Sequence, residues 1–120
     1  MRDMDRLGRR SVLTCPDCDG VMWEIDDDDL SHYRCHVGHA YRADMMALAL
    51  DEDLRHALGS ALRALEERIA LTEKLRWLAS ERGHNQSADT WARMIEEIER
   101  EADALRMAIT RVDEVTDWAA

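Results

Sequence analysis

Apolar residues recur at helical spacing through most of the chain after residue 50. Within residues 51–82 they are four, three, four and four positions apart, at Leu54, Leu58, Ala61, Leu65 and Ile69. Within residues 88–117 the separations mostly alternate between four and three, as in a coiled-coil seam, at Trp91, Ile95, Ile98, Ala102, Leu105, Ile109 and Val112. Each pattern places apolar side chains on one helix face. The sequence therefore predicts two helices, at about residues 51–82 and 88–117.

A short polar segment separates the two predicted helices. Gly83 can adopt the left-handed backbone that ends many helices, and Ser87 can serve as the N-cap of the next one. The chain should then turn back on itself, so that residues 42–120 form an antiparallel helical hairpin. We expect residues 43–50 to form a separate helical turn that leads into it.

The segment at residues 11–41 follows a different pattern. Turns that contain Cys or Gly, and the acidic run at residues 26–29, separate three runs that favour β-structure, Ser11–Thr14, Val21–Ile25 and Ser31–Arg34. This pattern predicts a small unit of β-hairpins, preceded by a polar tail at residues 1–10. The predicted fold class is therefore α+β and mostly α, a small β-hairpin unit followed by a long helical hairpin.

The β-hairpin segment also carries four residues with metal-ligand spacing. Cys15 and Cys18 lie three positions apart around a turn, where two thiolates can hold one tetrahedral ion. Cys35 follows after sixteen intervening residues, and His39 after three more. A Cys-x-x-Cys pair alone also fits a redox pair, but that reading would need a βαβ context, which the sequence around Cys15 does not offer. The spacing predicts a zinc ribbon with one structural zinc ion per chain, bound by Cys15, Cys18, Cys35 and His39.

Two histidines compete for the fourth position. His36 adjoins Cys35, and adjacent side chains usually point in different directions, whereas Gly38 permits a sharp turn that would bring His39 inward. We favour His39 and keep His36 as the alternative. Asp19 stands where such knuckles often use glycine, and Asp tolerates positive φ better than most residues. Four protein ligands leave no position open for a catalytic water, so we predict no enzyme here.

Charge and composition narrow the classes of function. The chain has 26 acidic and 16 basic residues, a formal net charge of -10, and neither the part before residue 40 nor the part after it has a basic excess. Nucleic-acid binding is therefore not expected. No stretch is apolar for long enough to cross a membrane, and no signal peptide is evident. Three cysteines, an odd number, do not suit a disulfide framework, so we expect a cytoplasmic protein.

The cysteine motifs resemble a known family. The run LTCPDCDGVMWE at 13–24, the run YRCHVGHAY at 33–41 and the segment ALRALEER at 61–68 are similar to the C-terminal extension of some bacterial CheB-type chemotaxis methylesterases. In that pattern His39 matches the histidine of a Cys-x-x-Gly-His element, which supports it as the ligand. The methylesterase domain uses a Ser-His-Asp set on a parallel α/β sheet, and this sequence has no segment of that length or pattern. Ser60 is expected to be an ordinary helix residue.

These observations predict a non-catalytic regulatory or interaction module, associated with chemotaxis-like signalling and able to bind a signalling protein. Two alternatives remain. One is a zinc-thiolate redox sensor, in which oxidation of the thiolates releases the metal. The other, less favoured, is a zinc ribbon that binds nucleic acid.

The helices carry more apolar residues than two seams need. Beside the seams lie Leu62, Leu71, Leu75, Leu78 and Met94. Because two helices have only one groove between them, we predict that two hairpins pack face to face as a homodimer.

Overall fold

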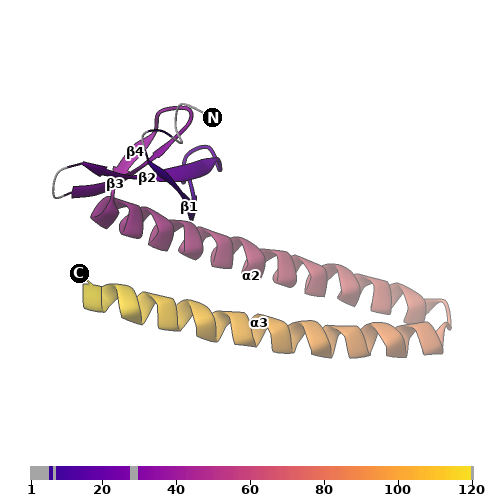
Figure 1. Ribbon diagram of the computed structural model, residues 1–120. Coiled ribbons are helices and arrows are strands. Elements are labelled where there is room, and N and C mark those ends of the chain that lie inside the picture. Colours follow the sequence, from indigo (N-terminus) through magenta and orange to yellow (C-terminus); the bar gives the residue numbers. More distant parts are fainter. Residues whose placement is uncertain (1–5, 7, 28–29, 120) are drawn as a thin grey trace. The chain divides into compact units, whose positions relative to one another are not determined.

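A four-stranded antiparallel sheet is followed by two long helices (Figure 1). The computed structural model describes residues 6, 8–27 and 30–119. Its elements are β1 (Arg9–Thr14), β2 (Val21–Asp27), β3 (Leu30–Cys35), β4 (Ala40–Arg42), α2 (Ala43–Glu81) and α3 (Asn85–Ala119). The predicted fold class, α+β and mostly α, is confirmed. Most of the predicted polar tail and two residues of the acidic run, 28 and 29, lie outside the described residues.

The sheet has the order β1-β2-β3-β4, so each strand pairs with its neighbour in the sequence. Each of the three predicted β runs lies within one of the first three strands. Strand β1 is irregular between Arg10 and Thr14. There the Ser11 hydroxyl donates to the Met22 carbonyl at 2.7 Å and accepts the Leu13 N–H at 3.1 Å. Strand β4 was not predicted, because three residues are too few to show an alternation of apolar and polar positions.

The first compact unit, residues 1–54, has a small core built around two cysteines. Fully buried Cys15, Met22, Cys35 and Met46 form one cluster, against which Leu13, Tyr33, Tyr41 and Leu50 pack. Met46 and Leu50 are four positions apart on α2, so one face of its first turns covers the cluster. A core of this size contributes little hydrophobic stabilisation.

Helix α2 begins at Ala43, so the predicted separate turn at residues 43–50 is wrong. Met46 and Leu50 give residues 43–50 a buried face of their own, and no glycine or proline precedes Gly59 in the helix.

Helix α2 ends in a Schellman motif at Gly83, the glycine at which the sequence predicted a left-handed helix end. Its φ is +75°, its N–H donates to Ser80 O at 3.1 Å, and the His84 N–H donates to Ala79 O at 2.8 Å.

Helix α3 begins earlier than predicted. Its first residue is Asn85, and the Ala88 N–H donates to the His84 carbonyl at 3.0 Å. Ser87 is therefore inside the first helical turn and is not the N-cap. The sequence could not distinguish these starts, because His84, Asn85 and Ser87 are all polar and exposed.

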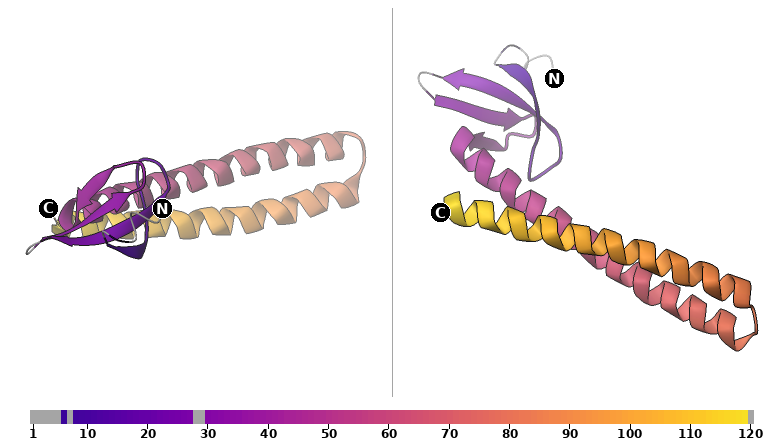
Figure 2. Two further views of the ribbon diagram at one scale, coloured as in Figure 1. Left: turned by 45° about the horizontal axis from the view of Figure 1, so that its top comes forward. Right: turned by 90° about the horizontal axis from the view of Figure 1, so that it is seen from below.

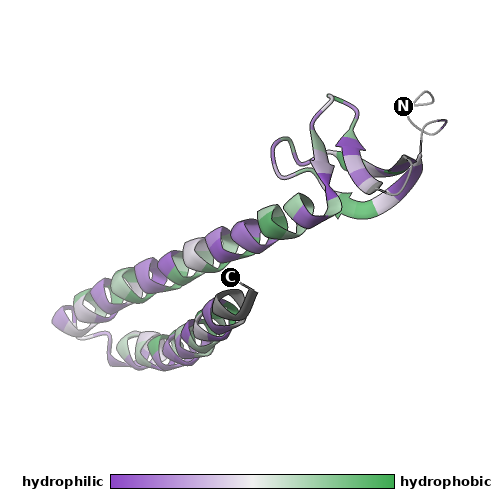
Figure 3. Cartoon of the chain, turned by 90° about the vertical axis from the view of Figure 1, so that its left-hand side faces the viewer, coloured by the Kyte–Doolittle hydropathy of each residue, from purple (hydrophilic) through white to green (hydrophobic). Residues whose placement is uncertain are grey.

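In the second compact unit, residues 55–120, α3 lies antiparallel alongside α2 (Figure 2). Arg106 pairs with Glu66 at 3.6 Å and Arg55 with Asp113 at 3.9 Å, which sets the register of the two helices. The side chains most buried in this unit are Thr72, Ala79, Ala88, Ile98 and Ala102. Around each helix of the hairpin, apolar and polar residues alternate (Figure 3).

The buried line on α2 differs from the predicted one. Leu54 is 46% exposed and Ala61 is exposed, so neither belongs to the seam. Buried and half-buried side chains instead alternate at spacings of four and three, at Leu58, Leu62, Leu65, Ile69 and Thr72. Residues spaced by 3.5 positions on average stay on the face that α3 covers, whereas residues four positions apart move progressively around the helix.

The apolar strip that suggested a homodimer is largely covered within one chain. Leu62, Leu75, Leu78 and Met94 are half-buried, whereas Leu71 is 60% exposed. The hairpin therefore accommodates more apolar surface than the sequence indicated.

Candidate metal centre

The sheet topology brings the four predicted ligands to one place. In a sheet of sequential antiparallel strands, the turn from β1 to β2 and the turn from β3 to β4 lie at the same end. The first turn carries Cys15 and Cys18, and the second carries Cys35 and His39. Between the two turns, Met22 on β2 pairs with Cys35 on β3. The ligand pairs therefore face each other across the two central strands.

The first turn is a knuckle closed by backbone hydrogen bonds. The Cys15 N–H donates to Gly20 O at 2.7 Å, and the Asp19 N–H donates to Cys15 O at 2.9 Å. Asp19 has a φ of +62°, the left-handed conformation that its place after Cys18 predicted. This left-handed residue lets the chain leave the knuckle toward β2.

The second turn is a shorter version of the same knuckle. The Cys35 N–H donates to His39 O at 3.0 Å, and the Gly38 N–H donates to Cys35 O at 3.1 Å. Gly38, with a φ of +112°, is the left-handed residue. It precedes the ligand His39, whereas Asp19 follows the ligand Cys18. The predicted turn at Gly38 is confirmed.

The ligand atoms form a compact group, all within 4.8 Å of one another. His39 Nδ1 lies 3.3 Å from Cys35 Sγ and 3.6 Å from Cys15 Sγ, and Cys18 Sγ lies 3.7 Å from Cys35 Sγ. A disulfide needs a sulfur–sulfur distance of about 2.05 Å, so the cysteines are thiols at metal-sharing distance. Cys15 and Cys35 are buried, His39 is half-buried and Cys18 is exposed. Together, the four residues are positioned to bind one metal ion.

His36 does not join this group. Its side chain is exposed, and its ring lies beside Gly20. A methyl group on Gly20 would lie 3.4 Å from Cys18 Sγ and 3.5 Å from His36 Cε1. His36 thus sits next to the first knuckle without contributing a ligand atom. Within residues 6, 8–27 and 30–119, no other group of three or more ligand-type side chains converges in this way.

The backbone prepares Cys35 for metal binding. Burial opposes ionisation of its thiol, but N–H groups of His39, Val37 and Gly38 outweigh burial and lower the pKa of Cys35 to about 6. At Cys18 the Gly20 N–H lowers the pKa, yet desolvation and the thiols of Cys15 and Cys35 leave it raised overall. Thiolates are the metal-binding form, so the lowered pKa of Cys35 favours metal binding.

One hydrogen bond joins the two knuckles outside the ligand group. The Tyr41 hydroxyl, on β4, donates to the Asp17 carboxylate between Cys15 and Cys18. This bond, with desolvation, raises the pKa of Tyr41 to about 12, so the hydroxyl remains a donor at neutral pH. This contact was not expected from the sequence, because it joins an exposed turn residue to a strand that was not predicted.

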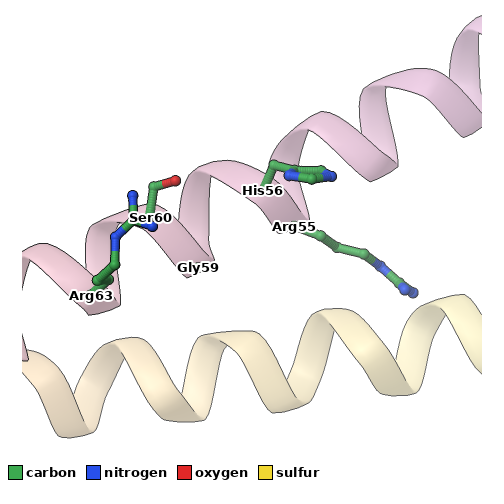
Figure 4. A pocket seen from close by; sticks show the side chains of 5 residues that line it. All are labelled: Arg55, His56, Gly59, Ser60 and Arg63. Carbon is green, nitrogen blue, oxygen red and sulfur yellow. The ribbon is translucent and has the colours of Figure 1, made fainter.

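The helical hairpin carries a hollow of a different kind. Arg55, His56, Gly59, Ser60 and Arg63 line it, all from α2 (Figure 4). Ser60 lies within the helix, as predicted, rather than on a strand-to-helix elbow of the esterase type. In the described part of the chain, neither helix has a stretch long and apolar enough to span a membrane.

Two glycines offer a matched test of these conformations. A methyl group on either Gly38 or Gly59 would meet nothing within 4 Å. Gly38 is left-handed, so Gly38→Ala should cost about 1–2 kcal/mol. Gly59 is helical and exposed, so Gly59→Ala should stabilise the hairpin by about 0.5–1 kcal/mol. Calorimetry should show transition midpoints that move in opposite directions, and shifts of the same sign would contradict the two backbone assignments.

The chain matches no protein-family model, no curated protein and no solved structure.

Proposed function

We propose that this chain is a non-catalytic interaction module built on one structural zinc ion. The observation that carries the proposal is the spacing of the ligand atoms. With Zn–S at about 2.3 Å and Zn–N at about 2.05 Å, tetrahedral geometry requires edges of about 3.75 Å between sulfurs and about 3.55 Å between sulfur and nitrogen. Three of the six edges have direct counterparts: 3.7 Å between the sulfurs of Cys18 and Cys35, and 3.3 and 3.6 Å from His39 Nδ1 to the sulfurs of Cys35 and Cys15. These three distances are close to the zinc values, and all four ligand atoms lie within 4.8 Å of one another.

The donor set favours zinc over other common ions. Three thiolates and one imidazole are poor ligands for Ca²⁺ and Mg²⁺, which take oxygen, and four such groups in a tetrahedron are typical of structural zinc. The four ligands complete the coordination shell. The ion would therefore hold the two knuckles together and would not activate water.

An interaction role is supported by the features of the helical hairpin. The hollow on α2 combines two arginines, a histidine and a helical serine, with no carboxylate among its lining residues. It lacks the carboxylate that orients the base of an esterase, and its serine lies within a helix and not on a strand-to-helix elbow. The two long helices instead offer an extended surface on which another protein could bind. The resemblance of the two cysteine motifs to CheB-type extensions supports a place in chemotaxis-like signalling, with a signalling protein as partner.

We retain the homodimer as part of this proposal. Leu71 and Trp77 on α2 are each 60% exposed, so large apolar side chains remain uncovered in the single hairpin. The hairpin arms also differ in charge, since residues 55–82 have six basic and four acidic side chains and α3 has four and nine. Antiparallel pairing of residues 55–82 on one copy with α3 on the other would place opposite charges together.

The exposure of Cys18 favours a redox sensor as the second candidate. Cys18 is the exposed thiol of the three, so a peroxide would reach it first. Zinc release by micromolar peroxide, with reversal by a thiol reductant, would support the sensor. Zinc that resists such oxidation would support the purely structural role.

Metal analysis tests the main proposal. The purified full-length chain should contain one equivalent of zinc, and Co²⁺ in its place should give the intense ligand-field and thiolate charge-transfer absorption of a tetrahedral sulfur-rich site. A weak, octahedral-type Co²⁺ spectrum, or no stoichiometric zinc, would overturn the proposal. Hydrolytic turnover abolished by one substitution would overturn its non-catalytic part.

A further inference from the structure

The two knuckles have few links besides the proposed metal. Strands β2 and β3 join them at the base, where Met22 pairs with Cys35. Farther along the turns, the Tyr41 hydroxyl bonds to the Asp17 carboxylate. Asp17 lies between the two ligands of the first knuckle, and Tyr41 lies two residues after His39. This second link therefore joins the first knuckle to the strand that follows the second knuckle.

We propose that Tyr41 is a positioning residue of the metal site, which acts through Asp17 to hold the knuckles together and to slow metal release. The inference rests on the proposed zinc site. A metal ion leaves a closed tetrahedral site only when ligands separate, and in this fold Cys15 and Cys18 separate from Cys35 and His39 when one knuckle moves away from the other. A bond from a hydroxyl to a carboxylate restrains that movement and is stronger than one between neutral groups.

The bond also acts before the metal arrives. It limits the distance between the two ligand pairs, so less conformational freedom is lost on binding. Contacts of this outer kind commonly change metal affinity by about 10–100-fold when removed. Asp17 is exposed, which places the expected effect toward the lower end of that range.

The tyrosine ring has a separate structural role that the test must keep apart. Tyr41 packs against the core cluster of Cys15, Met22, Cys35 and Met46. Tyr41→Phe keeps the ring and removes only the hydroxyl. Tyr33 is a matched control, because it pairs with Tyr41 across the sheet, packs against the same cluster, and its hydroxyl makes no hydrogen bond within the described residues.

The experiment follows the transfer of Zn²⁺ from the chain to excess chelator. Tyr41→Phe should release zinc about tenfold faster than the unmodified chain. Asp17→Ala removes the acceptor of the same hydrogen bond and should have the same effect, and because Asp17 is exposed this substitution does not disturb the core. The double variant should be no faster than either single one, and Tyr33→Phe should be unchanged. The Co²⁺ spectrum of Tyr41→Phe should match that of the unmodified chain, because all four ligands remain.

Two results would overturn the inference while leaving the zinc site intact. One is unchanged release from both Tyr41→Phe and Asp17→Ala, and the other is a double variant whose effects multiply, since the two residues would then act independently. An unmodified chain that binds no zinc would be a different failure, because it would reject the proposed function itself.

Discussion

Cys35→Ser is expected to abolish zinc binding and to unfold the sheet while the helical hairpin stays folded. Cys35 is fully buried, and its Sγ lies near both His39 Nδ1 and Cys18 Sγ, so it is the central ligand of the group. Serine stays protonated at neutral pH and cannot replace a thiolate. Structural zinc contributes on the order of 10 kcal/mol of apparent folding free energy, as much as the whole stability of a typical small domain.

The small core explains why the sheet should not survive this loss. The first unit buries few large side chains, chiefly Trp23, Met22 and Met46, and two more members of its core are the metal ligands themselves. Metal analysis should find no zinc in the variant. Hydrogen exchange should show loss of protection across residues 9–42, with protection retained in α3. A variant that binds a full equivalent of zinc would contradict the proposed coordination.

The histidines provide the control. His36→Ala should retain zinc, because the His36 ring lies beside Gly20 and outside the ligand group. His39→Ala should lose it, because His39 Nδ1 is within 3.6 Å of two sulfurs. The opposite pair of results would show that His36 is the ligand in solution.

The metal-binding knuckles were the part of the structure most accessible from sequence. Their geometry is local, since a few residues set each turn. The left-handed residues at Asp19 and Gly38 follow from the backbone preferences of Asp and Gly in those positions. Even the choice of His39 over His36 depended on one glycine. Spacing indicated that Cys15, Cys18 and Cys35 would meet, and Gly38 together with the family resemblance favoured His39 as the fourth residue.

Features that depend on distant parts of the chain were less accessible. The contact between Tyr41 and Asp17 exists only because β4 pairs with β3, and a three-residue strand has no periodicity to detect. Met46 lies in a segment predicted as a separate turn, and its burial depends on the sheet it covers. The prediction of which α2 residues form the seam was wrong for a related reason. Leu54 and Leu62 are both apolar, and only the path of α3 determines that Leu62 is covered and Leu54 is not.

Ile98→Asp is expected to unfold the helical hairpin without removing the metal. Ile98 is 3% exposed, and the register set by the pairs Arg106–Glu66 and Arg55–Asp113 places it across from buried Thr72. The substitution removes about 1.5–3 kcal/mol of apolar burial and adds a carboxyl group with no partner in the seam, which costs about 1–3 kcal/mol more. The sum is comparable to the stability of a two-helix unit, so circular dichroism should show a large loss of helix. The zinc ligands lie within residues 15–39, so zinc content should remain at one equivalent.

Leu71→Glu is the matched control on the same hairpin. Leu71 is 60% exposed in the single chain, so its replacement should change the unfolding free energy of a monomeric hairpin by no more than about 0.5 kcal/mol. Light scattering on the same samples also tests the homodimer. If two hairpins pair through exposed apolar residues that include Leu71, the unmodified chain should have twice the mass of one 13.9 kDa chain, and Leu71→Glu should be a folded, zinc-containing monomer. A folded, unmodified chain with the mass of a monomer at micromolar concentration would exclude the homodimer. In that case the seam from Leu58 to Ala79, closed by α3, stabilises the hairpin alone, and the unfolding midpoint of the unmodified chain should not depend on protein concentration.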